Sequence, residues 1–305
     1  MPTPTVPLIS FIASVTYGLP STILYFLTFY VILNKRKSFD SSYFQIYVFD
    51  GFMNLFTYFN AFFTIRLSSI TCYDCFMAPV FKNLANFRFL KFIATMGVHM
   101  AYVQYSISTL VSLNRLSVLL NYSFFEPIWR KFTWLFIILI YFLPFLNTYI
   151  VFEYEVKVMY FEEDESFSLV SPGFPVAKLY SILIPFMFIT TTLCVLLNSF
   201  SILFLRSQSI QKKKAESNFL IILSITCLVQ IIGTVLTIAI TLLSTSSVLG
   251  VLLMILPYSS DGLCLVQPWL LVSFCGSIRK EIKSLFGLSP PKSESQMFQV
   301  RSITN

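Results

Sequence analysis

Long apolar segments recur along the chain and alternate with short polar joints. They cover about residues 8–33, 43–65, 89–119, 132–152, 177–205, 218–243 and 249–275. Each has about the 20 residues that a helix needs to cross a hydrocarbon core of about 30 Å. Lipid offers the backbone no hydrogen-bond partners, so each segment is expected to be helical. The pattern predicts an all-α membrane protein, a seven-transmembrane helix bundle.

A short amphipathic segment follows the seventh apolar run, at residues 277–286. Its apolar residues fall at helical spacing and its bases take the opposite face. A basic helix of this kind lies in the headgroup plane rather than crossing the bilayer. We expect one membrane domain over residues 1–286, ending in this helix on the cytoplasmic side, and a polar, disordered tail over residues 287–305.

Composition supports the membrane class and excludes a water-soluble one. Of the 305 residues, 56% are hydrophobic and only 11% are charged, whereas soluble domains carry roughly 25% charged residues. The net charge of +7 comes from bases at the ends of apolar runs. Nucleic-acid binding needs bases gathered on one folded face, so no nucleic-acid partner is expected.

The distribution of bases predicts an orientation. Most of the 21 lysines and arginines lie in the joints 34–42, 120–131 and 206–217 and after residue 276. Basic joints stay in the cytoplasm, which places the N-terminus outside and the C-terminus inside. The joint between Arg66 and Lys91 is basic on the outer side and is the exception. The acidic joint at residues 153–165 would also lie outside.

Several strings together resemble those of the nematode serpentine receptor class gamma (Srg) chemoreceptors. They are Tyr17-Gly18-Leu19-Pro20-Ser21 in the first span, Asp50 with Asn54 in the second, Ser112-Leu113-Asn114-Arg115-Leu116-Ser117 in the third, and Asp261 with Pro268-Trp269-Leu270-Leu271 in the seventh. The similarity covers nearly the whole chain. It implies a chemosensory G-protein-coupled receptor that binds a small extracellular molecule and sits in the plasma membrane of a sensory cilium.

The sequence departs from the rhodopsin-type pattern at two switch positions. Asn114-Arg115-Leu116 stands where Asp-Arg-Tyr would be expected, and Gln267-Pro268 begins the string that replaces Asn-Pro-x-x-Tyr. The fold implied by the resemblance does not depend on these strings. The switching mechanism of rhodopsin-type receptors does, so it is not carried over to this chain.

Arg115 is the leading candidate for contact with a G protein, at the cytoplasmic end of the third span. The alternative is a topology anchor whose charged head reaches the lipid surface by snorkelling. The basic joints share both interpretations, because bases also bind anionic inner-leaflet lipid. The predicted G-protein-facing residues are Arg115, Arg130, Lys131, Lys212, Lys213 and Lys214.

Ligand contacts are expected in the outer halves of the third, fifth, sixth and seventh spans. Depth and polarity select His99, Tyr102, Tyr180, Tyr258 and Asp261. His99 is the only histidine, and a single interhelical hydrogen bond is the alternative to a sensing role. Asp261 lies about 20 Å from the cytoplasmic end of its span at 1.5 Å per residue, where the floor of an outward cavity would be.

Asp50 and Asn54 form a second polar position inside the bilayer. Intramembrane carboxylates are costly and face the bundle interior. The pair could hold a hydrated cation or simply bond neighbouring helices. Asp50 lies about 10 Å from its cytoplasmic end, so it is not expected to touch Asp261.

The cysteines predict modifications but no metal site. Cys72 and Cys75 share an outer joint and could form a local disulfide or remain two thiols. Cys275, before the amphipathic helix, is placed for palmitoylation or stays an unmodified thiol. One histidine and scattered cysteines offer no zinc ligand set, and no cofactor is expected.

Two other function classes fit a multi-span chain: a transporter or channel, and an intramembrane enzyme. A transporter or channel would show related halves with broken helices around midplane sites, and no internal repeat is found. An intramembrane enzyme is not expected, since there is no histidine pair, no Gly-x-Ser-x-Gly elbow and no carboxylate pair at one depth. The sequence therefore favours a receptor over both.

Overall fold

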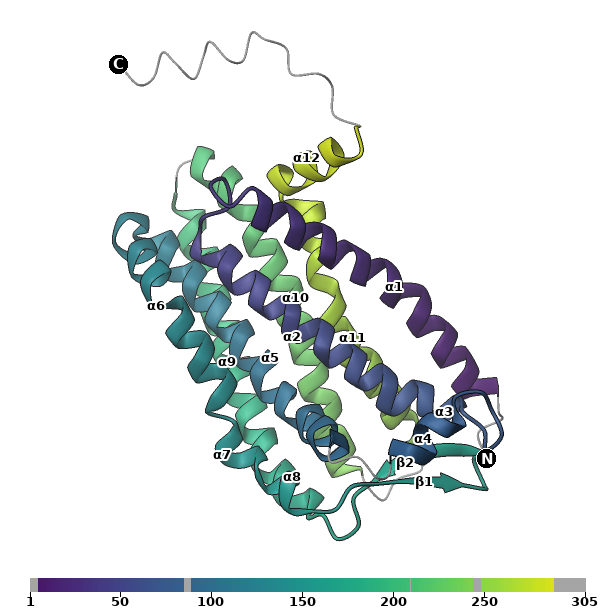
Figure 1. The fold of residues 1–305 in the computed structure, drawn as a ribbon. Helices are drawn as coiled ribbons and strands as arrows, with labels where there is room; N and C mark the ends of the chain where they lie inside the picture. The colour runs from purple at the N-terminus through teal and green to yellow at the C-terminus, as the bar shows by residue number, and fades with distance from the viewer. Residues whose placement is uncertain (1–4, 85–88, 209, 244–247, 288–305) are drawn as a thin grey trace, which may run out of the picture.

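The computed structural model describes residues 5–84, 89–208, 210–243 and 248–287 (Figure 1). Long helices dominate this part of the chain: α1 (Thr5–Asn34), α2 (Ser42–Ala61), α5 (Phe89–Leu120), α6 (Tyr122–Phe142), α9 (Val176–Arg206), α10 (Ile210–Leu242) and α11 (Leu249–Phe274). They run side by side as one bundle in Figure 1. Short elements join them: η1 (Phe62–Leu67), α3 (Ser68–Ile70), α4 (Ala78–Leu84), α7 (Phe145–Thr148), α8 (Ile150–Glu153), β1 (Lys157–Phe161), β2 (Ser166–Val170) and α12 (Gly276–Leu285).

Five helices of the described residues are long and apolar enough to cross a membrane. They are Pro7–Asn34, Tyr122–Thr148, Val176–Arg206, Ser217–Leu242 and Leu249–Phe274. The chain is therefore a multi-pass membrane protein. Helices α2 and α5, with 20 and 32 residues, also reach the length needed to cross a membrane, but they carry more polar side chains. Those side chains are turned inward, since α2 packs against α5, α6 and α11, and α5 against α6 and α9.

Helix ends differ from the predicted spans for local reasons. The predicted span 132–152 starts ten residues earlier, at Tyr122, where the Asn121 side chain accepts a hydrogen bond from the Phe124 amide at 3.2 Å. An N-cap of this kind starts a helix. The same span is interrupted after Phe142, next to Pro144, because proline cannot donate to the helix ladder. Helix α10 begins at Ile210, before the predicted 218, so the basic joint there is helical.

Aromatic side chains of α1 and α2 pack with apolar side chains of α11 in one hydrophobic core. Tyr25, Phe29 and Tyr47 are fully buried there, and their ring centroids lie 5.6–6.3 Å apart. Gly51 permits this approach, because a Cβ on it would lie 2.5 Å from the Phe29 ring. Pairs of rings at these separations add stabilisation beyond their buried area.

A small antiparallel hairpin, β1 with β2, covers one end of the bundle. Its register pairs Lys157 with Val170 and Phe161 with Ser166. The ring of Phe81 on α4 stacks between Phe63 of η1 at 5.2 Å and Phe167 of β2 at 5.6 Å. The hairpin, α3 and α4 lie at the end of the bundle where α1 begins, and α12 lies at the opposite end (Figure 1).

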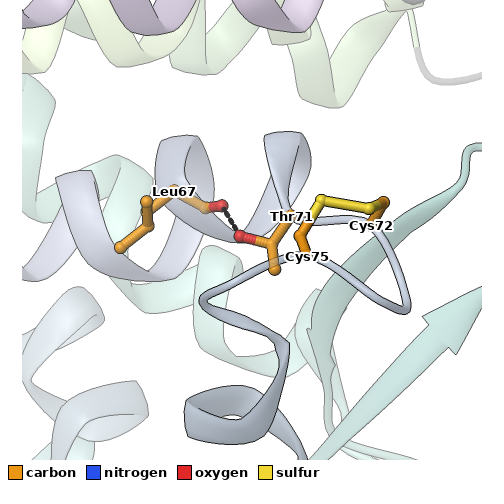
Figure 2. The surroundings of a disulfide bond; sticks show 4 residues. All are labelled: Leu67, Thr71, Cys72 and Cys75. Carbon is orange, nitrogen blue, oxygen red and sulfur yellow. Dashed lines mark hydrogen bonds between the residues drawn. A yellow bond between two sulfur atoms is a disulfide. The ribbon is translucent and has the colours of Figure 1, made fainter.

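A disulfide joins Cys72 and Cys75 in the joint between α3 and α4 (Figure 2). The structure therefore shows the local disulfide that was one of the two alternatives. Beside it, the Thr71 hydroxyl donates to the Leu67 carbonyl at 2.6 Å. This bond ends α3 by satisfying a carbonyl that has no further helical donor.

Helix α12 coincides with the predicted amphipathic segment. Ile278 is fully buried against the aromatic core, whereas Arg279 and Lys280 are exposed. The tail predicted to be disordered covers residues 287–305, and residues 288–305 lie outside the described part of the chain.

Candidate functional site

Asp261, the single acidic residue of α11, forms an ion pair with Arg66 of η1. The Arg66 Nη2 and the Tyr17 hydroxyl both donate to the Asp261 Oδ2 atom. The Arg66 side chain is 2% exposed and that of Asp261 is 4% exposed. We call these three residues the outer cluster, because the sequence predicts that this end of the bundle lies outside. It ties α1, η1 and α11 together with charges that are shielded from solvent.

The π-helical geometry of η1 explains how Arg66 reaches the bundle interior. Arg66 follows Tyr58 by eight residues, which a regular α-helix of 3.6 residues per turn would place about 80° around the axis. A π-helix has one more residue per hydrogen-bonded turn, which brings the side chain back toward the face of Tyr58. Tyr58 itself donates to the Ser14 carbonyl at 2.9 Å, on α1. Both side chains therefore face α1.

Tyr258, one turn before Asp261, borders the outer cluster. The Arg66 Cζ atom lies 5.7 Å from the centre of the Tyr258 ring. The Tyr258 hydroxyl donates to Ser10 on α1 at 2.8 Å, and the residue is 38% exposed. The seam between α1 and α11 is therefore partly open beside the cluster.

The five predicted ligand contacts separate into three places. Asp261 and Tyr258 belong to the outer cluster and its border. Tyr102 and Tyr180 pack together between α5 and α9, where the Asn147 side chain donates to the Tyr102 hydroxyl at 2.6 Å. The structure does not bring these two pairs to one cavity, and their roles stay predictions.

His99 lies apart from the other four, between α5, α6 and α7. Its ring nitrogens lie 2.9 Å from the Tyr141 carbonyl oxygen and 3.0 Å from the Thr148 hydroxyl, and its ring stacks on Phe145 at 4.0 Å. These contacts agree with the alternative given for His99, an interhelical hydrogen bond rather than a sensing role. Each nitrogen of the imidazole ring therefore has a hydrogen-bonding partner.

A second polar network lies deeper and centres on Asp50 and Asn54. The Asn54 amide donates to the Asp50 Oδ1 at 3.1 Å, and Gln267 of α11 donates to the Oδ2 at 2.5 Å. Gln104 of α5 donates to the Asn54 Oδ1 at 2.9 Å. Tyr25 of α1 donates to the Cys264 carbonyl at 2.6 Å, within reach of Asn54. We call these residues the midplane network, which links α1, α2, α5 and α11.

At the end of the bundle that carries α12, Arg115 is sandwiched between two aromatic rings. Its Cζ atom lies 3.9 Å from the centre of the Tyr43 ring on α2 and 4.0 Å from that of Phe219 on α10. The residue is 9% exposed. Cation–π contacts with two rings strengthen when desolvated. Arg115 is therefore held inside the bundle rather than extended toward the surface.

Next to Arg115, Glu126 and Ser42 join α2, α5 and α6. The Ser42 amide and hydroxyl both donate to the Glu126 carboxylate at 2.8 Å, and the Asn114 side chain donates to the Ser42 hydroxyl at 2.9 Å. Arg130 pairs with Glu126 at 3.2 Å and with Asp40 at 3.0 Å. The predicted G-protein-facing Arg130 is thus 41% exposed on its side chain but engaged in two ion pairs.

The chain is similar to known proteins over most of its length. The sequence profile described as "Srg family chemoreceptor" matches residues 11–282. The chain belongs to the Srg chemoreceptor family. It is also similar to serpentine receptor class gamma-31 of Caenorhabditis elegans, with 28% identity over 285 residues, 88% of this chain and 90% of that protein. The resemblance read from the sequence is confirmed.

The remaining predicted site residues of this Srg chemoreceptor have varied surroundings. The Lys131 Nζ lies 5.4 Å from the centre of the Phe132 ring. Lys212, Lys213 and Lys214 lie in helix α10, and their side chains are outside the described part of the structure. Cys275 is buried at the junction of α11 and α12, so its palmitoylation stays a prediction.

Two cavities flank these clusters. A groove of about 550 Å³ opens near the hairpin between η1, α3, α5 and β2, and its lining includes Asn60, Ser69 and Ser168. It lies beside η1, and Arg66, Asp261, Tyr258, Tyr102, Tyr180 and His99 are not among its lining residues. An enclosed cavity of about 20 Å³, room for about one water, lies at Asp50, Gln267 and Tyr43.

Sequence reasoning missed Arg66 as the partner of Asp261 and counted it only as an exception to the orientation rule. A signal was available, because intramembrane charges pair with one another. An arginine directly after one predicted span and an aspartate within another are natural partners. What the sequence could not give was the π-turn that aims Arg66 inward.

Proposed function

We propose that this chain is a chemosensory seven-helix receptor that binds a small extracellular ligand at the outer cluster and signals to a cytoplasmic G protein. Membership of the Srg family supports the receptor class. The ligand would contact Asp261, Arg66 and Tyr258, reached along the open seam between α1 and α11. The receptor would reside in a plasma membrane, with a sensory cilium as the expected place.

Seven crossings are part of this proposal. Helices α2 and α5 would cross with the five apolar helices, since 20 residues at 1.5 Å per residue already span about 30 Å. Their polar residues face neighbouring helices rather than lipid, as in the midplane network. The N-terminus would lie outside and α12 inside. The disulfide beside the hairpin supports an outer position for that end, because disulfides persist in oxidising compartments.

The observation that carries the proposal is that one helix, α11, contributes residues to both the outer cluster and the midplane network. Asp261 engages η1 and α1 at the outer cluster. Cys264, three residues later, accepts from Tyr25 and from Gln104, whose Nε2 lies 3.0 Å from its sulfur, and Gln267 donates to Asp50. A ligand that alters the Asp261 contacts would shift α11, and with it the midplane network. A ligand can favour a second arrangement only through such differential contacts.

The output would be the release of Arg115. In the structure, Tyr43 of α2 and Phe219 of α10 cover Arg115, so a G protein cannot reach it until these helices separate. Small helix shifts of this kind are a common switching device. Arg115, Arg130, Lys131, Lys212, Lys213 and Lys214 would then form the G-protein-facing surface.

Arg115→Ala tests the proposal. We expect it to abolish ligand-evoked second-messenger signals in a reporter cell exposed to a panel of small molecules, with surface expression retained. Lys37→Ala, an exposed base of the joint between α1 and α2, is the matched control and should signal normally. Normal signalling by Arg115→Ala would contradict the proposed role.

Tags on the two termini test the orientation independently. Antibody should reach an N-terminal tag on intact cells and a C-terminal tag only after permeabilisation. An N-terminus in the cytoplasm would overturn the receptor proposal and return the transporter alternative.

A further inference from the structure

The ion pair of the outer cluster leaves several hydrogen-bonding groups unused. Arg66 donates through Nη2 only, and no described residue accepts from its Nε or Nη1. Asp261 accepts through Oδ2 only, and no described residue donates to its Oδ1. A guanidinium has five N–H donors and a carboxylate about four acceptor sites. The pair therefore uses a minority of its capacity.

Burial makes this unusual. Both side chains are at most 4% exposed, and buried polar groups nearly always have partners. A buried donor or acceptor without one costs about 1–3 kcal/mol, and more when it is charged. The midplane network shows that the same bundle can give each carboxylate oxygen a partner, since both Asp50 oxygens accept hydrogen bonds. The unused groups of the outer cluster point to a ligand.

The unused groups define the chemistry of that ligand. Arg66 offers the N–H donors of Nε and Nη1, which carry a positive charge and therefore suit a carboxylate. Asp261 offers an acceptor with a negative charge, which suits an ammonium group. The pair itself is neutral, so an anion or a cation alone would leave a buried net charge, which is strongly unfavourable. A zwitterion satisfies both sets of groups and keeps the site neutral.

We infer that the outer cluster binds a small amino acid, whose carboxylate accepts from Arg66 and whose ammonium donates to Asp261. This inference rests on the proposed function and names its ligand class. The ligand approaches along the seam between α1 and α11, where Tyr258 is partly exposed. Binding loosens the direct contact between Arg66 and Asp261, because each exchanges part of it for the ligand.

The test uses the purified full-length receptor in nanodiscs and its thermal unfolding midpoint. The probes are α-, β- and γ-amino acids, each beside its amide, which lacks the carboxylate, and its N-acetyl derivative, which lacks the ammonium. At about 100 times Kd, a binding amino acid should raise the midpoint by about 5 °C or more. Both blocked forms should lose that shift.

Variants connect the shift to the residues. Arg66→Gln combined with Asp261→Asn removes both charges together, avoids an unpaired one, and should abolish the shift. Arg66→Lys keeps the charge but lacks the planar fork, and should weaken binding at least about tenfold. Lys157→Gln, an exposed outer base on β1, should retain the full shift.

The inference is wrong if no amino acid stabilises the receptor, if blocked forms stabilise it equally, or if the double variant keeps the shift. Its failure is separable from that of the proposed function. An uncharged agonist with an Arg115-dependent signal would keep the receptor and overturn the amino-acid ligand. An amino acid that binds without any signal would keep the amino-acid site and overturn the proposed receptor function.

Discussion

Asp50 and Asp261 are both buried aspartates on long helices of the bundle, yet their surroundings differ. Asp50 receives neutral amide donors on each oxygen, from Asn54 and Gln267. Asp261 receives a guanidinium and a phenol on one oxygen, and its other oxygen has no partner among the described residues. One carboxylate has an uncharged partner on each oxygen, and the other has an ion pair on one oxygen and no described partner on the second.

The difference separates a site built for stability from one that can exchange partners. A fully satisfied buried network fixes the helices that contribute to it. A charged pair with unused donors gains from any ligand that completes it, and its partners are held by fewer bonds. The midplane network is therefore expected to hold the bundle together, and the outer cluster to respond to what enters it.

Breaking the outer ion pair should give the largest effect. Arg66→Gln leaves Asp261 buried without a counter-charge, which costs about 3–5 kcal/mol of unfolding free energy. Adding Asp261→Asn removes the orphaned charge and should restore most of that loss. Thermal unfolding of the single and double variants in detergent, with surface expression as a second readout, measures this. A double variant no more stable than Arg66→Gln would show that the pair is not coupled.

Matched hydroxyl deletions compare the two sites directly. Tyr17→Phe removes a hydrogen bond to the charged Asp261, worth about 1.5–3 kcal/mol. Tyr25→Phe removes one to the neutral Cys264 carbonyl, worth about 1 kcal/mol. Unfolding midpoints of the two variants rank them. Equal losses of unfolding free energy would mean that the hydrogen bond to Asp261 is no stronger than the one to the Cys264 carbonyl. That result would contradict the contrast between the two sites.

The bundle and the family could be read from the sequence, because lipid imposes long apolar runs and a bias of bases. The amphipathic segment before residue 287 was found from its periodicity, and α12 matches it. Asp50, Asn54 and Asp261 could be singled out because a polar residue in an apolar run needs a partner. The partners themselves could not be read. Gln104 is distant in sequence from Asn54, and only packing brings their helices together.

The surroundings of Arg66 and Arg115 could not be predicted from the local sequence pattern. Both are single arginines near a span end, for which snorkelling to the lipid surface is the simple expectation. Instead, η1 carries Arg66 to Asp261, and Tyr43 with Phe219 hold Arg115 inside. A π-turn and a three-helix sandwich depend on tertiary packing, which one sequence does not specify.

The smallest effect is expected at Asp50 and gives the sharpest contrast with Asp261. In Asp50→Asn the new amide keeps one acceptor oxygen for Asn54, and its N–H₂ group faces Gln267. Gln267 can turn its own amide and accept there, since an amide carries both donors and an acceptor. The network is then nearly restored, and the loss should be about 1 kcal/mol. Unfolding of Asp50→Asn and Asp50→Asn/Gln267→Ala, measured beside Arg66→Gln, tests this. If Asp50→Asn alone destabilises as much as Arg66→Gln, the Asp50 carboxylate has a charged role that its neutral partners do not explain.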